Sequence, residues 1–578
     1  MKKLLRYLKN YIKESIIGPL FKMLEASFEL FVPIVMAQMI DVGIVRGDTE
    51  YIWQMGAILV GLGVLGLVCS LTAQYFAAKA SVGMGTALRH DLFAHIGELS
   101  YAELDQVGTS TLITRVTSDI NQVQAGVNLF LRLFLRSPFI VVGAFVMSFS
   151  ISQKLSLIFA IAIPLLALVI YGVMLLTIPL QKKVQAGLDQ VLQSTRENLS
   201  GIRVVRAFRM QRQEREEFEE ENRALLALQM LSGRLSALLN PVTYVIVNVA
   251  TIAIVWYGGR EVYAGHLTRG EVVALVNYMS QILLALVALF NLIVASTKAF
   301  ASAGRVSEVL EVQSSIVSGE AKWNEDIDLA ELVSFKNVSL TYGSAKEASI
   351  CNISFAVRKG QFVGIIGGTG SGKSSLVNLI PRLYDVTEGC VYVAGRDVKE
   401  YDLDSLRERI GVAEQKAVLF KGTLRENMQM GNALVTDEEI YRALEIAQAK
   451  EIVEQKGEGL DLHISQNGRN LSGGQRQRFI IARALVKKPD ILILDDSTSA
   501  LDFATDARLR KALVEHTKQM TVFVVSQRVS SVMNADKIFV LDDGKLVGEG
   551  THEVLRQSCE VYREICHSQL DEEVAKDA

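Results

Sequence analysis

The sequence predicts an α-helical domain with six membrane spans and long helical extensions beyond the membrane, followed by an α/β domain with a phosphate-binding loop. Three observations lead to this prediction. The chain has 578 residues, enough for several domains, and half of them are hydrophobic. Its long apolar segments all precede residue 300. A G-x-x-x-x-G-K-S pattern appears only after residue 330.

The overall charge and the cysteines exclude some classes of protein. The formal net charge of -3 is close to balance, which argues against a nucleic acid as a partner. Five cysteines show neither metal-binding nor redox spacing. We therefore expect packed thiols in a reducing compartment.

The first 14 residues are basic and amphipathic, with the sequence KKLLRYLKNYIK near their start. They lack the apolar core and small-residue cleavage site of a signal peptide. This pattern predicts a helix on the cytoplasmic face of a bilayer. A soluble helix with a solvated basic face is the alternative.

Six apolar segments follow, each long enough to cross a hydrocarbon core of about 30 Å. An even number of spans returns the chain to the side where it began, so the amino terminus and the C-terminal domain are both predicted to be cytoplasmic. The predicted spans are 17–43, 54–80, 128–151, 155–180, 236–258 and 272–297.

Two connections between the spans are much longer than the others, at 81–127 and 181–235. The second is rich in arginine, which places it on the cytoplasmic side. If each is a pair of helices, half its length protrudes by roughly 37 Å beyond the membrane. The tips fall near residues 101–110, with a break at Gly108, and near 200–208, with Gly201.

Polar residues within the predicted spans are candidates for a substrate cavity. Structural roles are the alternative, as ion-pair or hydrogen-bond partners inside the helical bundle. Arg132 and Arg136 begin the third span, and the favoured interpretation is that they extend to the cytoplasmic surface. The cavity candidates are Glu25, Glu29, Asn248, Asn277 and Gln281.

After a polar linker predicted at 314–329, residues 330–578 show the pattern of an α/β domain. Val338, Leu340 and Tyr342 alternate toward one face of a predicted strand. The apolar strand 362–366 leads into the phosphate-binding loop, and a helical pattern follows it. The residues expected to hold phosphates are Gly367, Thr369, Gly370, Ser371, Gly372, Lys373, Ser374 and Ser375.

A second motif region spans residues 471–502. It contains LSGGQ, a helix beginning there, and the apolar run 491–494, which ends in Asp495 and Asp496. Carboxylates just beyond such a buried parallel strand are placed to bind the metal of a nucleotide.

The phosphate-binding loop followed along the chain by LSGGQ resembles the arrangement in ABC-type ATPases. The resemblance covers residues 330 to 570. The resemblance implies ATP and Mg²⁺ as cofactors, with Mg²⁺ held by Ser374, Gln415 and Asp495. It also implies a catalytic role for Gln415, as a contact of the attacking water. It implies that Tyr342 stacks on adenine, although a strand tyrosine that merely packs is the alternative. Asp502 takes the place of the D-loop aspartate. The signature residues, which act on ATP bound by another copy of the domain, are Leu471, Ser472, Gly473, Gly474 and Gln475.

Two departures from the ABC pattern fall on one site. Asp496 stands where the family has the glutamate that activates water, and Gln527 replaces the switch histidine. An amide can donate a hydrogen bond to the γ-phosphate but cannot carry charge or move a proton. Glu414, beside Gln415, also stands where proline is usual.

Together these features resemble the degenerate half of heterodimeric bacterial multidrug ABC exporters. The resemblance implies short coupling helices at the two cytoplasmic tips and a non-identical partner half-transporter with an intact Glu and His. It implies an ATPase-coupled translocase in the plasma membrane that exports amphipathic small molecules. The alternatives are export of a peptide or lipid, and a regulator or channel gated by ATP without turnover.

Overall fold

The structure is a computed structural model that describes residues 4–323, 331–343 and 345–574. The chain divides into two compact units. The first comprises Met1–Gly97 and Ser110–Glu311, and the second comprises Glu98–Thr109 and Val312–Ala578. The part of the predicted linker at 314–323 thus belongs to the second unit, whereas 324–329 lie outside the described residues.

The first unit is entirely helical, as the sequence predicts. In the described part of the chain, six helical stretches are long and apolar enough to cross a membrane: Arg6–Ile44, Thr49–Glu98, Thr109–Ile151, Gln153–Ser200, Gln211–Tyr263 and Arg269–Glu311. Each contains one predicted span, so the six spans are confirmed. The elements are η1 (Leu4–Tyr11), α1 (Ile12–Gln38), η2 (Met39–Ile44), α2 (Thr49–Glu98), α4 (Thr109–Thr114), η3 (Arg115–Asp119), α5 (Ile120–Leu133), α6 (Arg136–Ile151), α7 (Gln153–Ser200), α8 (Ile202–Ala207), α9 (Gln211–Ala237), α10 (Leu239–Tyr263) and α11 (Arg269–Glu311).

The basic amino-terminal segment does not form a separate α-helix. Residues 4–11 form the 3₁₀ helix η1, and residues 12–14 are the start of α1, which follows directly. The Tyr7 hydroxyl donates to Asp91 Oδ2 on α2 at 2.9 Å. Contacts with α2, and not only the amphipathic pattern, therefore fix this segment.

Close backbone approach holds α1 against α11. A Cβ on Gly270 would lie 2.3 Å from the carbonyl oxygen of Ala37, so only glycine fits there. Further along the same pair, the buried Tyr278 hydroxyl donates to the Leu30 carbonyl at 2.7 Å. These contacts make α1 and α11 a packed pair within the apolar core of the unit.

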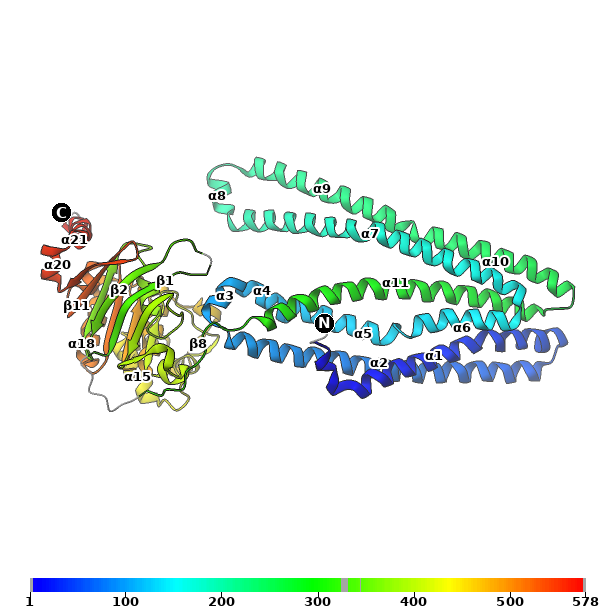
Figure 1. Cartoon of the computed structure of the whole chain (residues 1–578), viewed down its shortest axis with the longest axis horizontal. Coiled ribbons are helices and arrows are strands. Elements are labelled where there is room, and N and C mark those ends of the chain that lie inside the picture. Colours follow the sequence, from blue (N-terminus) through cyan, green and yellow to red (C-terminus); the bar gives the residue numbers. More distant parts are fainter. Residues whose placement is uncertain (1–3, 324–330, 344, 575–578) are drawn as a thin grey trace. The chain divides into compact units, whose positions relative to one another are not determined.

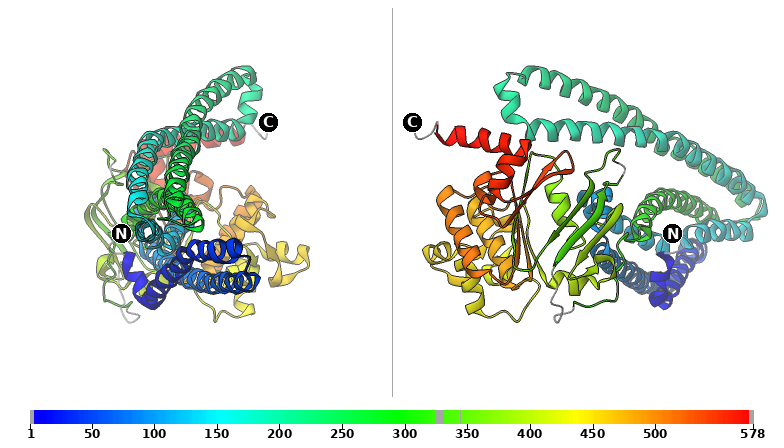
Figure 2. Two further views of the ribbon diagram at one scale, coloured as in Figure 1. Left: turned by 90° about the vertical axis from the view of Figure 1, so that its right-hand side faces the viewer. Right: turned by 60° about the vertical axis from the view of Figure 1, so that its left-hand side comes forward.

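The long helices α7 and α9 run side by side, and the short helix α8 joins their ends (Figures 1 and 2). Gly201 precedes α8, as the break expected near 200–208 requires. The other expected tip is α3 (Tyr101–Val107), which ends at Gly108 with a φ of 80°. Both tips are therefore short helices between longer helical stretches.

The second unit contains a six-stranded sheet of order β12-β11-β3-β10-β9-β6 and a four-stranded antiparallel sheet of order β2-β1-β4-β5. Within the larger sheet, β11, β3, β10, β9 and β6 are parallel, and β12 is antiparallel at the edge. The strands are β1 (Val333–Leu340), β2 (Ile350–Val357), β3 (Phe362–Gly367), β4 (Glu388–Val393), β5 (Arg396–Asp397), β6 (Ile410–Ala413), β7 (Gly422–Thr423), β8 (His463–Ile464), β9 (Ile491–Asp495), β10 (Thr521–Ser526), β11 (Lys537–Asp542) and β12 (Lys545–Gly550).

Helices cover the larger sheet, and two apolar clusters form its core. Strand β9 is buried along its whole length, as a central parallel strand should be. One expectation was wrong in detail: β1 ends at Leu340, so Tyr342 lies beyond the strand. The helices are α12 (Lys373–Asn378), η4 (Val398–Glu400), α13 (Leu403–Glu408), α14 (Leu424–Met428), α15 (Asp437–Ile446), α16 (Lys450–Lys456), η5 (Gly459–Asp461), η6 (Gln466–Gly468), α17 (Gly473–Val486), α18 (Phe503–His516), α19 (Val529–Val532), α20 (His552–Ser558) and α21 (Glu560–Val574).

Candidate functional site

The phosphate-binding loop joins the end of β3 to the start of α12. Gly370 and Gly372 have φ values of 85° and 91°, which L-residues rarely adopt. A Cβ on Gly372 would also meet the Ser349 carbonyl oxygen at 2.5 Å. These glycines let the loop turn tightly, so that its N–H groups and the N-terminus of α12 can face an anion.

Lys373 lies within this loop and is 8% exposed. Its Nζ donates to the carbonyl oxygens of Gly367 and Gly368 at 3.0 and 2.5 Å, and to Ser371 Oγ at 3.3 Å. Burial lowers the pKa of this amine, while the carboxylates of Asp495 and Asp496 act to raise it. The ammonium is thus placed where a phosphate would compensate its charge.

Ser374 and Asp495 meet at the carboxyl ends of β3 and β9. Ser374 Oγ donates to Asp495 Oδ1 at 2.9 Å. Asp495 is 7% exposed, and burial raises the pKa of its carboxyl group. A hydroxyl and a carboxylate oxygen are hard donors that suit Mg²⁺, which completes its shell with water and nucleotide phosphates. The donor set therefore fits the predicted cation.

Asp496, the next residue, leaves the strand with a φ of 44°. Its Oδ2 accepts a hydrogen bond from Gln415 Nε2 at 3.3 Å. Burial raises the pKa of the Asp496 carboxyl group, while the Gln415 hydrogen bond and the Lys373 charge act to lower it. The carboxylate predicted to contact water therefore lies on the Gln415 side.

Gln527 follows β10 and faces the phosphate-binding loop. The Thr369 hydroxyl donates to Gln527 Oε1 at 3.4 Å. The carboxyl ends of β6, β9, β10 and β3 thus bring Gln415, Asp496, Gln527 and the loop together at one edge of the sheet. This is where ligands bind in open parallel sheets.

Tyr342 is half-buried beside the loop, next to Ser375 on α12. Its ring meets that of Tyr384 edge to face, with centroids 4.9 Å apart. Tyr384 follows α12 and fixes the orientation of the Tyr342 ring. This arrangement provides an aromatic surface beside the phosphate-binding loop, where a base could stack.

The LSGGQ segment forms the N-terminus of α17. Ser472 Oγ accepts from the Gln475 N–H at 3.3 Å, and the Ser472 N–H donates to Gln475 Oε1 at 3.0 Å, which makes a capping box. Leu471 is buried beneath this turn. A Cβ on Gly474 would approach the Ala500 carbonyl oxygen to 3.0 Å, whereas one on Gly473 would meet only Ala500 Cβ, at 3.7 Å. The turn is therefore rigid, and it directs the positive end of a helix outward.

Asp502 serves as the N-cap of α18, since its side chain accepts from the Thr505 N–H at 3.3 Å. Hydrogen bonding to the Thr505 side chain, and then to its backbone N–H, lowers the pKa of Asp502. Within this chain, the contact made by Asp502 is thus that of a helix cap.

Helix α3 contacts its own unit at Tyr384, beside Tyr342. The Tyr384 hydroxyl donates to Asp105 Oδ2 at 2.7 Å, and the Tyr101 ring lies 6.0 Å from that of Tyr384. Burial, followed by the hydrogen bond to Asp105, raises the pKa of Tyr384, so the phenol remains a donor at neutral pH. Tyr384 therefore connects Tyr342 to α3.

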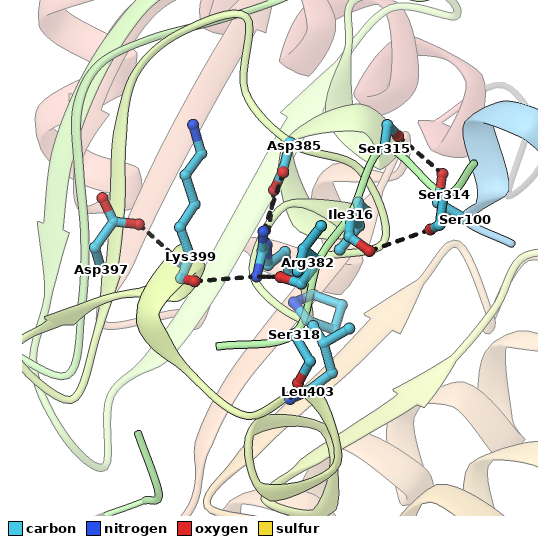
Figure 3. A network of polar contacts seen from close by, with 12 residues as sticks. Ser100, Ser314, Ser315, Ile316, Ser318, Arg382, Asp385, Asp397, Lys399 and Leu403 are labelled. Atoms are coloured by element: carbon cyan, nitrogen blue, oxygen red, sulfur yellow. Dashed lines mark hydrogen bonds and ion pairs between the residues drawn. The ribbon is translucent and has the colours of Figure 1, made fainter. Parts of the chain in front are cut away.

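The described part of the linker is bound to the same unit (Figure 3). Ser100 and Ser315 share a hydrogen bond of 3.2 Å, and Glu103 Oε1 accepts from the Ser315 N–H at 3.3 Å. The buried Arg382 donates to Asp385 Oδ1 at 2.8 Å and to the carbonyl oxygens of Val317 and Lys399 at 3.0 and 3.2 Å. Residues 314–318 of the predicted linker are thus held against the second unit.

The candidate cavity residues in the membrane unit fall into different environments. Lys22 Nζ contacts Glu25 Oε2 at 2.5 Å and Ser70 Oγ at 3.1 Å. Gln281 Nε2 donates to the backbone oxygen of Glu29 at 3.3 Å, which joins α11 to α1. Asn277 donates to the Val273 carbonyl of its own helix, and Asn248 on α10 is exposed. The structure thus brings Glu25, Glu29 and Gln281 toward one region but gives Asn277 a partner in its own helix.

The contact of Arg136 differs from the prediction that this side chain extends to the cytoplasmic surface. Its Nη2 pairs with Glu29 Oε2 at 2.7 Å, so it does not simply extend to the membrane surface. A carboxylate within a span requires a cationic partner, and Glu29 finds one on the neighbouring helix α6.

Three residues important for the geometry escaped the sequence reasoning: Tyr384, Asp105 and Gln569. Gln569 on α21 contacts the backbone on both sides of Arg528. No local pattern marks these residues, because each partner is at least 40 residues away along the chain. Only the folded contacts identify them.

Comparison with known proteins matches the family described as ABC transporter transmembrane region over residues 15–286 and the family described as ABC transporter over residues 350–499. An uncharacterised ABC transporter ATP-binding protein of Mycobacterium tuberculosis is 35% identical over 93% of both chains. An ATP-dependent lipid A-core flippase of Desulfotalea psychrophila is 34% identical over 81% of both chains. The Bacillus subtilis protein YgaD, whose name proposes multidrug export, is 30% identical over 98% of both.

Among solved structures, a bacterial Atm1-family ABC exporter with ATP bound has a TM-score of 0.78 and 22% identity. The match covers 97% of this chain and 98% of that one. This likeness extends the agreement in fold across both units.

Proposed function

Because the chain belongs to the ABC transporter family and joins an exporter-type membrane region to an ABC ATPase domain, we propose that it is one half of a heterodimeric exporter of amphipathic small molecules. ATP binding closes the two ATPase domains, and their separation after hydrolysis returns the transporter to its inward-facing state. In this pair, the chain binds ATP at a site of slow turnover. Its LSGGQ residues complete the faster site of the partner.

The observation that carries this proposal is the placement of Asp496. Its side chain is one methylene shorter than that of the usual glutamate, and its Oδ2 lies 3.3 Å from Gln415 Nε2. A displacement of about 1 Å in a catalytic group can cost about 10²-fold in rate. Gln527 supplies a neutral amide in the place of a histidine, which could carry charge and move a proton. Binding groups are therefore complete, while both hydrolytic groups are altered.

The intact signature supports a non-identical partner. The capping box of Ser472 keeps the N-terminus of α17 ordered, so this chain can stabilise a γ-phosphate bound elsewhere. A homodimer would contain two impaired hydrolytic sites. A partner with an intact Glu and His makes one competent site from the two chains.

The substrate class rests on the membrane unit and on relatives. The Lys22–Glu25 and Arg136–Glu29 ion pairs lie among apolar helices, a mixed surface that suits an amphipathic molecule. The name of YgaD favours drug-like molecules, and the lipid A-core flippase makes a lipid the second candidate. Vesicles that contain the purified pair distinguish the two substrate classes, when transport of a fluorescent cationic dye is compared with transport of a fluorescent lipid.

The first test is the ATPase rate of this chain alone and co-expressed with the half-transporter encoded beside it. We expect activity to rise at least about tenfold with the neighbour, and to be lost when the catalytic Glu of the neighbour is changed to Gln. An ordinary rate from this chain alone would mean that Asp496 is a working base. The heterodimer proposal would then be wrong.

Tyr384→Phe tests the link between the ATP site and α3. The variant keeps the ring against Tyr342 but removes the hydrogen bond to Asp105. Since a hydrogen bond to a charged group contributes about 1.5–3 kcal/mol, we expect the transport rate per ATP hydrolysed to fall at least about tenfold. Transport and ATPase rates measured on the same vesicles give this ratio.

Asp105→Asn is the matched control for this prediction, because an amide oxygen still accepts from the Tyr384 hydroxyl. It should preserve most of the transport per ATP. If Tyr384→Phe lowers ATP hydrolysis and transport by the same factor, Tyr384 supports the ATP site and does not couple it to α3.

A further inference from the structure

The switch segment that carries Gln527 is bound by the C-terminal helix. Gln569 Nε2 donates to the Gln527 carbonyl oxygen at 2.7 Å. Gln569 Oε1 accepts from the Val529 N–H at 2.8 Å. One side-chain amide thus bonds to the peptide groups on both sides of Arg528, and we call these two hydrogen bonds the switch clamp.

The backbone at this position requires such a partner. Helix α19 starts at Val529 and has no side-chain cap of its own, so the Val529 N–H is one of the free donors at a helix start. The Gln527 carbonyl lies in the turn between β10 and α19. A primary amide presents one acceptor and one donor side by side, which matches this pair of groups.

The rest of α21 explains how Gln569 is directed toward the switch. Tyr562 and Cys566 are buried in the apolar core of the ATPase domain, with 0% and 2% exposure. Residues 562, 566 and 569 fall on one face of a helix at spacings of four and three. The Tyr562 hydroxyl is also 2.7 Å from His552 Nδ1 on α20. In Figure 2 these two helices are the red elements beside the end of the larger sheet. The anchored face of α21 therefore determines where Gln569 lies.

The clamp acts on the residue that faces the phosphate-binding loop. Gln527 is exposed, and its Oε1 accepts only from Thr369 Oγ1, at 3.4 Å, among the contacts of the described residues. A long hydrogen bond of this kind does little to fix a side chain. Hence the direction of the Gln527 side chain depends on its backbone, and the clamp fixes that backbone.

We propose that Gln569 is a positioning residue of the ATP site: it holds the Gln527 backbone so that the side-chain amide points at the γ-phosphate. This makes α21 part of the machinery that distinguishes ATP from ADP. The inference rests on the proposed function only in that the site of this chain binds ATP, and it is independent of the partner and of the transported molecule.

The test measures the preference of this chain for ATP over ADP in membranes that contain the full-length transporter. Photolabelling with 8-azido-ATP marks this chain, and unlabelled ATP or ADP displaces the label. We expect Gln569→Ala to weaken displacement by ATP about tenfold, the effect of losing about 1.4 kcal/mol, and to change displacement by ADP less than about twofold. Only ATP has the γ-phosphate that Gln527 faces.

Two further variants separate the clamp from packing. Gln569→Glu has the same length and keeps an acceptor for the Val529 N–H but cannot donate to the Gln527 carbonyl, so it should lower ATP preference as alanine does. Ser568→Ala, on the adjacent residue whose hydroxyl bonds only to the Ile565 carbonyl of its own helix in the described structure, should leave the preference unchanged. If Gln569→Ala fails to fold, Gln569→Glu still tests whether loss of the hydrogen bond to Gln527 lowers the ATP preference.

The double variant Gln527→Ala/Gln569→Ala gives the decisive comparison. If Gln569 acts through Gln527, the double variant should be no weaker for ATP than Gln527→Ala, within about twofold. Losses that multiply, or an unchanged ATP-to-ADP ratio in both Gln569 variants, would overturn the proposal. If the chain without substitutions bound neither ATP nor ADP, both this inference and the proposed function would be wrong. If this chain alone hydrolysed ATP, only the heterodimer proposal would be wrong.

Discussion

Replacing Asp496 by Glu and Gln527 by His together should raise the ATPase rate of this chain alone by about 10²-fold. The Ser374–Asp495 pair and the Lys373 loop contacts are unaffected by these changes, so the phosphates and cation keep their binding groups. The longer glutamate extends the carboxylate by about one C–C bond beyond its present position beside Gln415. The imidazole supplies a group that can carry a proton near neutral pH.

The control for this gain is Asp496→Gln with Gln527→His, in which the added length comes without a carboxylate. It should remain as slow as the unchanged chain. Measurements of phosphate release from the purified chain at saturating ATP give both rates. A double variant that binds ATP but stays slow would show that something other than these two side chains limits turnover, and the degenerate-site argument would fail.

Local patterns in the sequence were sufficient for the parts of this site that lie within one short segment. The phosphate-binding loop and β9 follow from motifs whose spacing requires a strand, a turn and a helix. The six spans follow from hydropathy alone, because a lipid environment requires long apolar helices. Even the helix breaks at Gly108 and Gly201 were predicted from a residue type at the middle of each long connection.

Contacts between distant segments could not be predicted in this way. Tyr342 was placed in a strand by alternation, yet β1 ends at Leu340 because its pairing with β2 ends at Ile350. Arg136 has no sequence neighbour that predicts its pairing with Glu29, which lies 107 residues earlier. The clamp of Gln569 on the switch likewise depends on how α21 packs, which periodicity within α21 does not specify. A pattern can indicate which face of a helix is buried but not which residues it meets.

Gly473→Asp should abolish most ATP hydrolysis by the assembled transporter, a loss of about 10²-fold or more, and should preserve ATP binding at the phosphate-binding loop of this chain. Gly473 is the first residue of α17, where an aspartate is compatible with the helix and even favourable to its dipole. The fold of this chain should therefore tolerate the change. The partner-bound γ-phosphate would instead meet a second negative charge at the N-terminus that is proposed to stabilise it.

Gly473→Ala is the matched control, because a Cβ there has only Ala500 Cβ nearby, at the ordinary contact distance of 3.7 Å. The ATPase rate of this variant should stay within a few-fold of the rate of the pair without substitutions. The comparison separates the effect of the added charge from the effect of the added side-chain volume. The two rates are measured on the co-expressed pair, with 8-azido-ATP labelling of this chain as the check on its own site. If Gly473→Asp instead removes that labelling and spares hydrolysis, the signature does not act on ATP bound by the partner. The proposed action of LSGGQ on the competent site of the partner would then be wrong.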